Sequence, residues 1–157
     1  YTFRHGPIAF IVFDAGETSK SRSILYSGDA VYEDYLDEQI RWARKAMQEP
    51  LFSTAPMQIC LIHVPMIDHP DKSDYLLQRW LNVHFVPMLD DAGVDLMISA
   101  DLHEFMYCTP GTMNNPFPIL VNDDLRRLDC VYESGQFVMT MYNSSGKEEF
   151  STVLEVE

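Results

Sequence analysis

The sequence has few basic residues. It contains 11 Lys and Arg against 24 Asp and Glu, which gives a formal net charge of −13 at pH 7. General binding to nucleic acid is not expected, because a protein needs surplus positive charge to displace counterions from a phosphate backbone. The acidity does not exclude a phosphate-ester substrate, since bound metal ions would supply positive charge that the count omits.

Long apolar runs and paired cysteines are also missing. No apolar run approaches the roughly 20 residues that a membrane span needs, so no membrane insertion is expected. Cys60, Cys108 and Cys130 are widely spaced and form no C-x-x-C pair. They predict buried thiols and no zinc ribbon, with one disulfide left open. The sequence also has no P-loop and no G-x-S-x-G nucleophile motif.

What is present is an ordinary globular composition. Hydrophobic residues make up 46% of the 157 residues and charged residues 22%. This length suits one compact domain with a sizeable core. No internal repeat or linker divides the chain, so a single domain over residues 1–157 is expected.

The first two thirds of the chain alternate between strand and helix patterns. Short apolar runs predict buried strands, and apolar residues at helical spacing predict helices between them. In order, the segments are strand 7–15, helix 33–47, strand 57–63, helix 74–92 and strand 94–99. Pro87 is expected to kink the second helix or to separate its last turn. This order predicts a parallel α/β core.

The last third changes character. Four strand-like segments, residues 117–121, 127–133, 136–143 and 150–156, are separated by turn residues such as Ser134-Gly135. They predict an antiparallel meander that continues the sheet. The expected fold class is therefore α/β, with a mixed sheet, flanking helices and a terminal meander.

Polar residues lie at the carboxyl end of each of the three predicted parallel strands. They are Asp14, His63, and Asp101 with His103. Binding sites in open α/β sheets collect at the carboxyl ends of the strands, so these side chains are expected at one edge. An extended Asp101-Leu102-His103 segment would turn both ligands to one side. Carboxylate and imidazole suit Zn, Mn or Fe better than Ca. Taken alone, His63 is more typical of a strand-end histidine that bonds to the backbone.

Four segments match, in order and spacing, the motifs of one enzyme family. Residues 1–14 (YTFRHGPIAFIVFD) are similar to Y-S-F-x-x-G-x-x-x-F-I-x-L-D, and the helix with Gln39 and Trp42 is similar to Q-x-x-W-L. Residues 62–66 (IHVPM) match x-H-x-P-x, and residues 94–105 (VDLMISADLHEF) match V-D-L-x-L-S-G-H-x-H-x-Y. Together they resemble the C-terminal half of a calcineurin-like metallophosphoesterase, a group that includes the purple acid phosphatases.

The resemblance implies half of an α/β/β/α sandwich and part of a two-metal site. In such a site two Zn, Mn or Fe ions bind the phosphate and generate a hydroxide nucleophile. His63 falls on a ligand of the second metal, and His103 falls on a ligand of the first. Asp101 replaces a histidine that ligates the second metal, which adds negative charge and should shift the metal preference. No further catalytic residue is assigned to this chain.

The family's D-x-H, G-D-x-x-D and G-N-H-D/E motifs precede the segment that this chain matches. They supply the bridging aspartate and most ligands of the first metal, so the resemblance implies a chain that is inactive alone. The main hypothesis is the C-terminal part of a phosphoesterase acting on phosphate mono- or diesters. The alternatives are a degenerate member that binds a ligand or partner, and a structural domain. Expected partners are a small phosphate ester, the missing N-terminal half and, through an exposed sheet face, a second copy.

Overall fold

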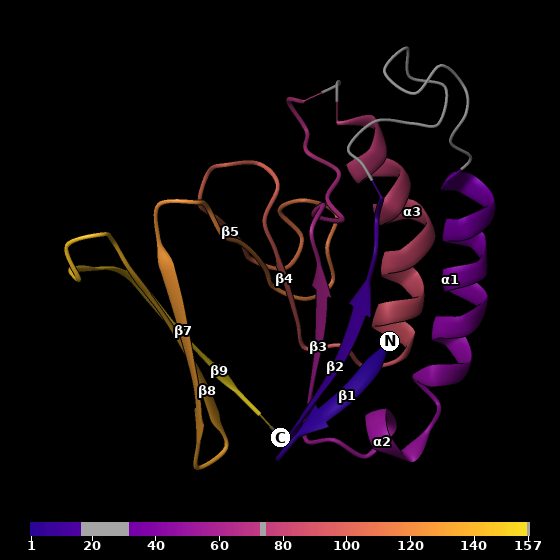
Figure 1. The fold of residues 1–157 in the computed structure, drawn as a ribbon, viewed down its shortest axis with the longest axis horizontal. Coiled ribbons are helices and arrows are strands. Elements are labelled where there is room, and N and C mark those ends of the chain that lie inside the picture. The colour runs from indigo at the N-terminus through magenta and orange to yellow at the C-terminus, as the bar shows by residue number, and fades with distance from the viewer. Residues whose placement is uncertain (17–31, 73–74, 157) are drawn as a thin grey trace.

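The computed structural model describes residues 1–16, 32–72 and 75–156. In chain order these residues form strands and helices in an α/β arrangement (Figure 1). The elements are β1 (Thr2–His5), β2 (Ile8–Phe13), α1 (Tyr32–Ala46), α2 (Pro50–Ser53), β3 (Met57–Ile62), α3 (Leu76–Asp91), β4 (Leu96–Ser99), β5 (Met106–Cys108), β6 (Ile119–Val121), β7 (Arg127–Glu133), β8 (Gln136–Tyr142) and β9 (Glu148–Glu155). The mixed α/β class is the one that the sequence pattern predicts.

The main sheet has six strands in the order β1-β2-β3-β4-β6-β5. The four inner strands run parallel, with Phe13 opposite Ile62 and Ser99 opposite Val121. The outermost strands, β1 and β5, pair antiparallel with their neighbours. Apolar side chains lie on both faces of β2, β3, β4 and β6, as expected of parallel strands buried between two layers. The predicted parallel core is therefore confirmed.

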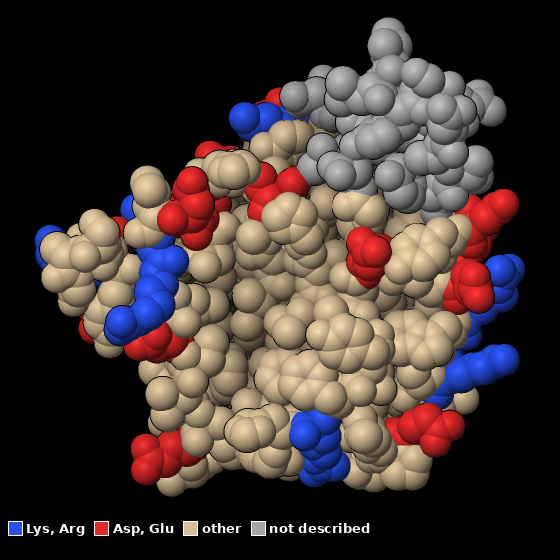
Figure 2. Space-filling view, viewed as in Figure 1, with Lys and Arg blue, Asp and Glu red and all other residues tan. Residues whose placement is uncertain are grey.

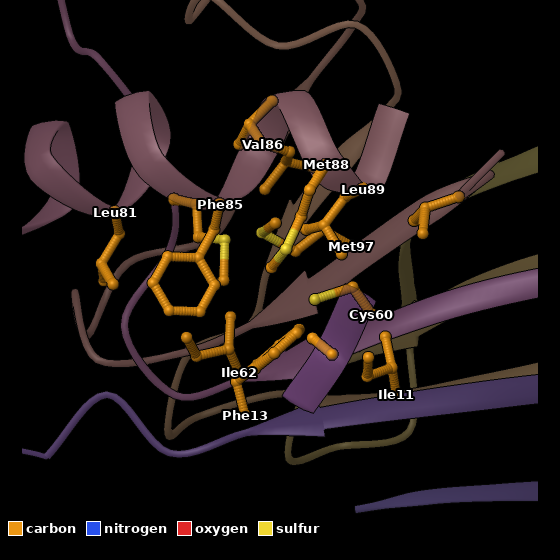
Figure 3. Packing of buried hydrophobic residues seen from close by; sticks show 14 of the residues in the cluster. Ile11, Phe13, Cys60, Ile62, Leu81, Phe85, Val86, Met88, Leu89 and Met97 are labelled. Carbon is orange, nitrogen blue, oxygen red and sulfur yellow. The ribbon is translucent and has the colours of Figure 1, made fainter. Parts of the chain in front are cut away.

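Helices α1 and α3 cover one face of the main sheet (Figure 1). Helix α1 is amphipathic and turns Leu36, Ala43 and the following residue Met47 inward. From α3, Leu81, Phe85 and Leu89 reach the side chains of the sheet, as Figure 3 shows. The rings of Phe85 and Phe13 meet edge to face, with their centroids 5.2 Å apart. Full burial of one such side chain stabilises the fold by about 1.5–3 kcal/mol.

The terminal meander forms a second sheet of three antiparallel strands, β7-β8-β9. The expectation that it continues the main sheet is therefore wrong for these strands, and only β6 joins that sheet. The meander instead packs on the face opposite the helices, where Phe137 and Met139 meet Ile59 and Leu96. The burial pattern of strand β8 agrees with this arrangement. Every second side chain of the strand is buried against the main sheet, and the side chains between them are partly exposed.

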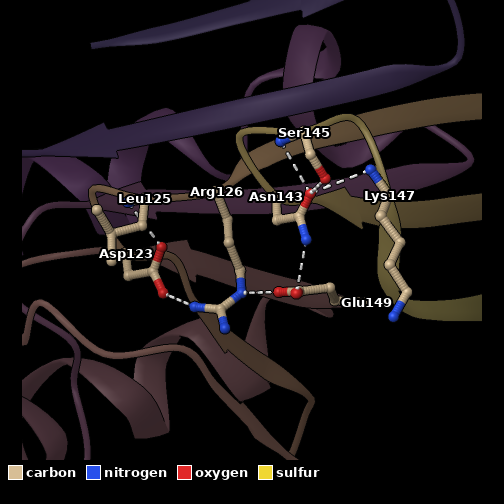
Figure 4. Close-up of polar contacts among 7 residues, drawn as sticks. All are labelled: Asp123, Leu125, Arg126, Asn143, Ser145, Lys147 and Glu149. Atoms are coloured by element: carbon tan, nitrogen blue, oxygen red, sulfur yellow. Dashed lines mark hydrogen bonds and ion pairs between the residues drawn. The ribbon is translucent and has the colours of Figure 1, made fainter.

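An ion-pair bridge ties the meander to the loop that follows β6. Arg126 donates to the buried carboxylate of Asp123 and, at 2.8 Å, to Glu149 on β9 (Figure 4). Asn143 donates to the same Glu149 at 2.9 Å. These contacts fix the 122–126 loop, which lies at the carboxyl edge of the main sheet.

Three short elements were not predicted, namely β1, α2 and β5. Strand β1 is an edge strand with mixed polarity, and β5 has only three residues, so neither gives a clear periodic signal. Helix α3 continues as one helix through Pro87, so its last turn is not a separate piece, and a kink at Pro87 stays a prediction. The predicted start of that helix at residue 74 lies outside the described residues. Among those residues, no helix is both long and apolar enough to span a bilayer.

Candidate metal centre at the carboxyl edge of the sheet

The carboxyl ends of the inner strands form one edge, and backbone hydrogen bonds extend past the strands there. The Ala100 N–H donates to the His63 carbonyl at 3.0 Å, and the Asn122 N–H donates to the Ser99 carbonyl at 2.7 Å. The residues that directly follow β3, β4 and β6 are therefore held side by side. The parallel order of the strands brings polar residues from distant parts of the sequence to this edge, as expected.

His63 and Asp101 meet at this edge. Nε2 of His63 lies 3.5 Å from Oδ1 of Asp101, with the imidazole 66% exposed and the carboxylate 10% exposed. Asp101 has a left-handed backbone (φ 70°), within a tight turn closed by the Leu102 N–H to the Ala100 carbonyl at 2.9 Å. Two ligands bound tetrahedrally to zinc at its usual bond lengths lie about 3.3–3.6 Å apart. The spacing of this pair fits two ligands of one ion.

His103 lies apart from that pairing. Its backbone is also left-handed (φ 53°), so residues 101–103 form a turn and not the extended segment on which their common orientation depended. The Nδ1 atom of His103 lies 3.8 Å from Oδ2 of Asp124, and its imidazole is 79% exposed. Within the described residues, no group of three or more His, Cys, Asp or Glu side chains could hold a metal ion. Metal binding by His63, Asp101 and His103 stays a prediction.

Asp14 follows β2 and is fixed by hydrogen bonds. Its Oδ1 accepts from the Gly16 N–H at 2.8 Å, and its Oδ2 accepts from the Tyr35 hydroxyl at 3.2 Å. Burial, followed by the neighbouring Asp14 carboxylate, raises the pKa of Tyr35. The Gln39 amide brackets the backbone of Asp14, accepting from its N–H at 3.0 Å and donating to its carbonyl at 2.6 Å. Gln39 thus ties α1 to the end of β2.

An open pocket of about 340 Å³ lies beside His63. Its apolar part comes from β2, β3 and β4, and its polar part from the residues that end β4 and follow β6. The lining residues are Val12, Phe13, Leu61, Ile62, His63, Ile98, Ser99, Ala100 and Asn122. Sequence reasoning missed Ser99 and Asn122, although Asn122 directly follows an apolar strand, as Asp14 and His63 do.

Two of the residues that line this pocket each have a buried polar atom without a hydrogen-bond partner in the described chain. Ser99 Oγ and Asn122 Oδ1 are buried and have no hydrogen-bond partner among the described residues. Buried polar groups are normally satisfied, and neither atom is exposed to a molecule in the pocket. Two larger pockets, of about 540 and 550 Å³, border α3 at a distance from this chemistry and contain none of the predicted ligands.

Comparisons with known proteins show likeness at the level of the fold. No family model matches the chain, and no curated protein matches it in sequence. A purple acid phosphatase, PPD1 from yellow lupin (Lupinus luteus) seeds, superposes with a TM-score of 0.65 at 11% identity. GAP50, described as the anchor in the inner membrane complex of Plasmodium, superposes with a TM-score of 0.57 at 17% identity.

The chain spans only part of both structures. The lupin match covers 99% of this chain and 32% of the phosphatase, and the Plasmodium match covers 100% of this chain and 53% of GAP50. The six-stranded mixed sheet, its two helices and the separate three-stranded sheet thus form an α/β fold similar to part of a purple acid phosphatase.

Proposed function

We propose that this chain is the C-terminal part of a two-metal phosphoesterase that hydrolyses phosphate mono- or diesters, and that it is inactive as an isolated chain. The observation that carries the proposal is the His63–Asp101 pair, 3.5 Å apart at the carboxyl edge of a phosphatase-like sheet. The order of the sequence motifs supports the same reading, because both residues fall on ligand positions of one metal.

The role of this chain would be to hold part of the site in place. His63 would bind an ion through Nε2, and Asp101 would bind the same ion through Oδ1. His103 would ligate the other ion of a pair of Zn, Mn or Fe ions. When bound, the ions would supply a hydroxide nucleophile and stabilise the charge that builds on phosphorus.

The pocket beside His63 would receive the ester. Its apolar floor, formed in part by Val12, Leu61 and Ile98, would exclude water from one side of the substrate. The remaining metal ligands would come from the N-terminal half of a longer parent polypeptide.

A degenerate member that binds a partner without turnover is the second candidate. Asp101 favours it, because a carboxylate stands where the family motif has an imidazole. The similarity to GAP50, which is described as an anchor, also favours it. An enzyme and a degenerate member differ in their metal content, since only the enzyme needs both ions.

The two candidates are separated by Asp101→His in the longer parent. The phosphoesterase proposal predicts that the parent contains bound metal, and that this change raises its activity on an aryl phosphate or alters its metal preference. Metal content by mass spectrometry and hydrolysis rates with Zn and Mn would be measured on both forms. If neither the parent nor its Asp101→His variant takes up metal, the result would favour the degenerate member.

A further inference from the structure

A second pocket lies along one side of α3, between this helix and the loop that follows β5. Its volume is about 550 Å³, which falls within the roughly 300–1,000 Å³ typical of small-molecule sites. None of its lining residues belongs to the candidate metal centre, so the proposed phosphoesterase does not use it. The residues that give the pocket its character are Val83, Val86, Pro87 and Asp90 on the helix, with Asn114 and Pro116 on the loop.

Two buried asparagines hold the loop wall of this pocket in place. The Asn82 side chain is 2% exposed and donates to the carbonyls of Met66 at 3.1 Å and Asn114 at 3.0 Å. It also accepts from the Asn114 side-chain amide at 3.2 Å. Asn115 is 3% exposed and donates to the Phe117 carbonyl at 2.8 Å. The pocket is therefore preformed, and a ligand can bind without first ordering its walls.

Pro87 leaves one carbonyl of the helix wall without its usual helical donor. Proline has no N–H, so Pro87 cannot donate to the carbonyl of Val83, four residues earlier in α3. Among the described residues, no hydrogen bond from outside the helix reaches this carbonyl either. Carbonyls of a helix point toward its C-terminus, so the Val83 oxygen is directed toward Pro87, and both residues line the pocket.

Asp90 lies one helical turn beyond Pro87 and also lines the pocket. Side chains of a helix tilt toward its N-terminus, so the Asp90 carboxylate is directed back toward Pro87 and the Val83 carbonyl. Asp90 is exposed, and within the part of the chain that the structure describes no Lys, Arg or His forms an ion pair with it. Two acceptors, one of them charged, therefore converge on the same part of the pocket.

The remaining walls are largely apolar. Val86 and Pro87 contribute from the helix and Pro116 from the loop, and the described lining includes no Lys, Arg or His. Acceptors beside an apolar wall suit an alkyl stem that ends in an ammonium group, whose three donors can be shared between a carboxylate and a carbonyl. We propose that this pocket binds an alkylammonium group, with the nitrogen between the Asp90 carboxylate and the Val83 carbonyl and the stem along Val86.

The charge of the molecule favours the same ligand. The chain carries a formal net charge of −13, and on the face drawn in Figure 2 acidic side chains lie at several separate places. A cation is therefore attracted over a long range, and an anion is repelled. Free alkylamines and the lysine side chains of a partner polypeptide share this chemistry.

The binding test is a titration of the isotope-labelled chain with pentylammonium, followed by NMR. We expect the amide signals of Val86 and Gly111 to shift, and the uncharged analogue pentanol to leave them in place. Asp90→Asn should weaken pentylammonium binding by about tenfold or more, because it removes the charged acceptor. Asp91→Asn is the matched control, since Asp91 is the next exposed carboxylate and lies outside this pocket. Equal shifts with pentanol, or equal weakening by the two variants, would overturn the proposal.

Pro87→Ala tests the role of the carbonyl, because it supplies the missing N–H. The restored helical bond should raise the melting temperature of the chain and, by occupying the Val83 oxygen, lower its affinity for pentylammonium. A raised melting temperature with unchanged affinity would show that the carbonyl is no ligand and would overturn the proposed geometry.

A blocked lysine, Nα-acetyl-lysine methylamide, separates the two sources of the ligand. It carries the same ammonium group on a piece of polypeptide backbone. Tighter binding of the blocked lysine than of pentylammonium would assign the pocket to a partner's lysine side chain, and the reverse order would assign it to a free amine. Both results uphold the alkylammonium site, whereas binding of neither compound would overturn it.

Discussion

His63 and Asp101 lie 3.5 Å apart, although they follow different strands of the main sheet. The parallel pairing of β3 and β4 brings them together, since each residue comes directly after or shortly after its strand. A pair of this kind can share one metal ion, but it offers only two of the ligands that a zinc ion requires.

The isolated chain should therefore bind zinc weakly and through this pair. His63→Ala and Asp101→Ala should each remove most of the heat measured by titration calorimetry, because either change leaves a single ligand. His84→Ala is the control, since His84 is an exposed histidine on α3 whose ring contacts that of Trp80 at a tilt of 35°, with centroids 4.2 Å apart. Equal loss of binding in the control would show that zinc binds histidines without regard to this edge.

The core beneath the helices should be sensitive to loss of volume. Phe85→Ala removes a fully buried ring that meets Phe13 and Trp80, so it should lower the free energy of unfolding by about 3–5 kcal/mol. Val83→Ala, two positions earlier and exposed, should change it by less than about 0.5 kcal/mol. Urea unfolding followed by circular dichroism measures both. Similar effects of the two changes would contradict the packing of α3.

Glu149 should make stability depend on acid pH. Its hydrogen bond from Asn143 and its contact with Arg126 lower the pKa of this carboxyl from its ordinary 4.5 (Figure 4). A lowered folded-state pKa gives stability that is present above the unfolded pKa and lost as the pH falls through the folded one. Glu149→Gln should flatten this part of the pH profile, and Glu148→Gln should not. A Glu149→Gln profile with the original slope would contradict the bridge.

The buried cysteines should be chemically inert in the folded protein. Burial raises the pKa of Cys60 far above its usual range and that of Cys108 to about 11. Thiolate is the reactive form, so both residues should resist a thiol reagent at pH 8 and react only after unfolding in urea. Mass spectrometry of labelled peptides locates the modified residue. Rapid labelling of Cys60 in the native protein would contradict its placement in the core.

Much of the fold could be predicted because the strong local signals agree with the tertiary structure. The apolar runs that become β2, β3 and β4 are fully buried on the face that packs against the helices, and the helices between them carry apolar stripes. The separate meander could not be foreseen, because a strand's hydrophobic pattern does not say which strand it pairs with. The short elements β1, α2 and β5 carry too few residues for a periodic signal.

The candidate site was predictable only in part for a similar reason. Strand order places His63 and Asp101 at one edge, and that can be inferred from sequence. The left-handed backbone at Asp101 and His103 cannot, because residues other than glycine rarely adopt it and no local pattern predicts it here. This backbone turns His103 toward Asp124. Asn122 was not predicted as a residue of the site, because an amide is an uncommon metal ligand and the residue lies outside the matching motifs.

The central claim is that this chain holds only part of a two-metal site. It is tested most directly by assaying the isolated, folded chain for hydrolysis of an aryl phosphate in the presence of Mn or Zn. We expect no hydrolysis above the metal-only control, because His63, Asp101 and His103 cannot complete two coordination spheres. Robust hydrolysis that copurifies with the folded chain and is lost in His63→Ala would contradict the claim.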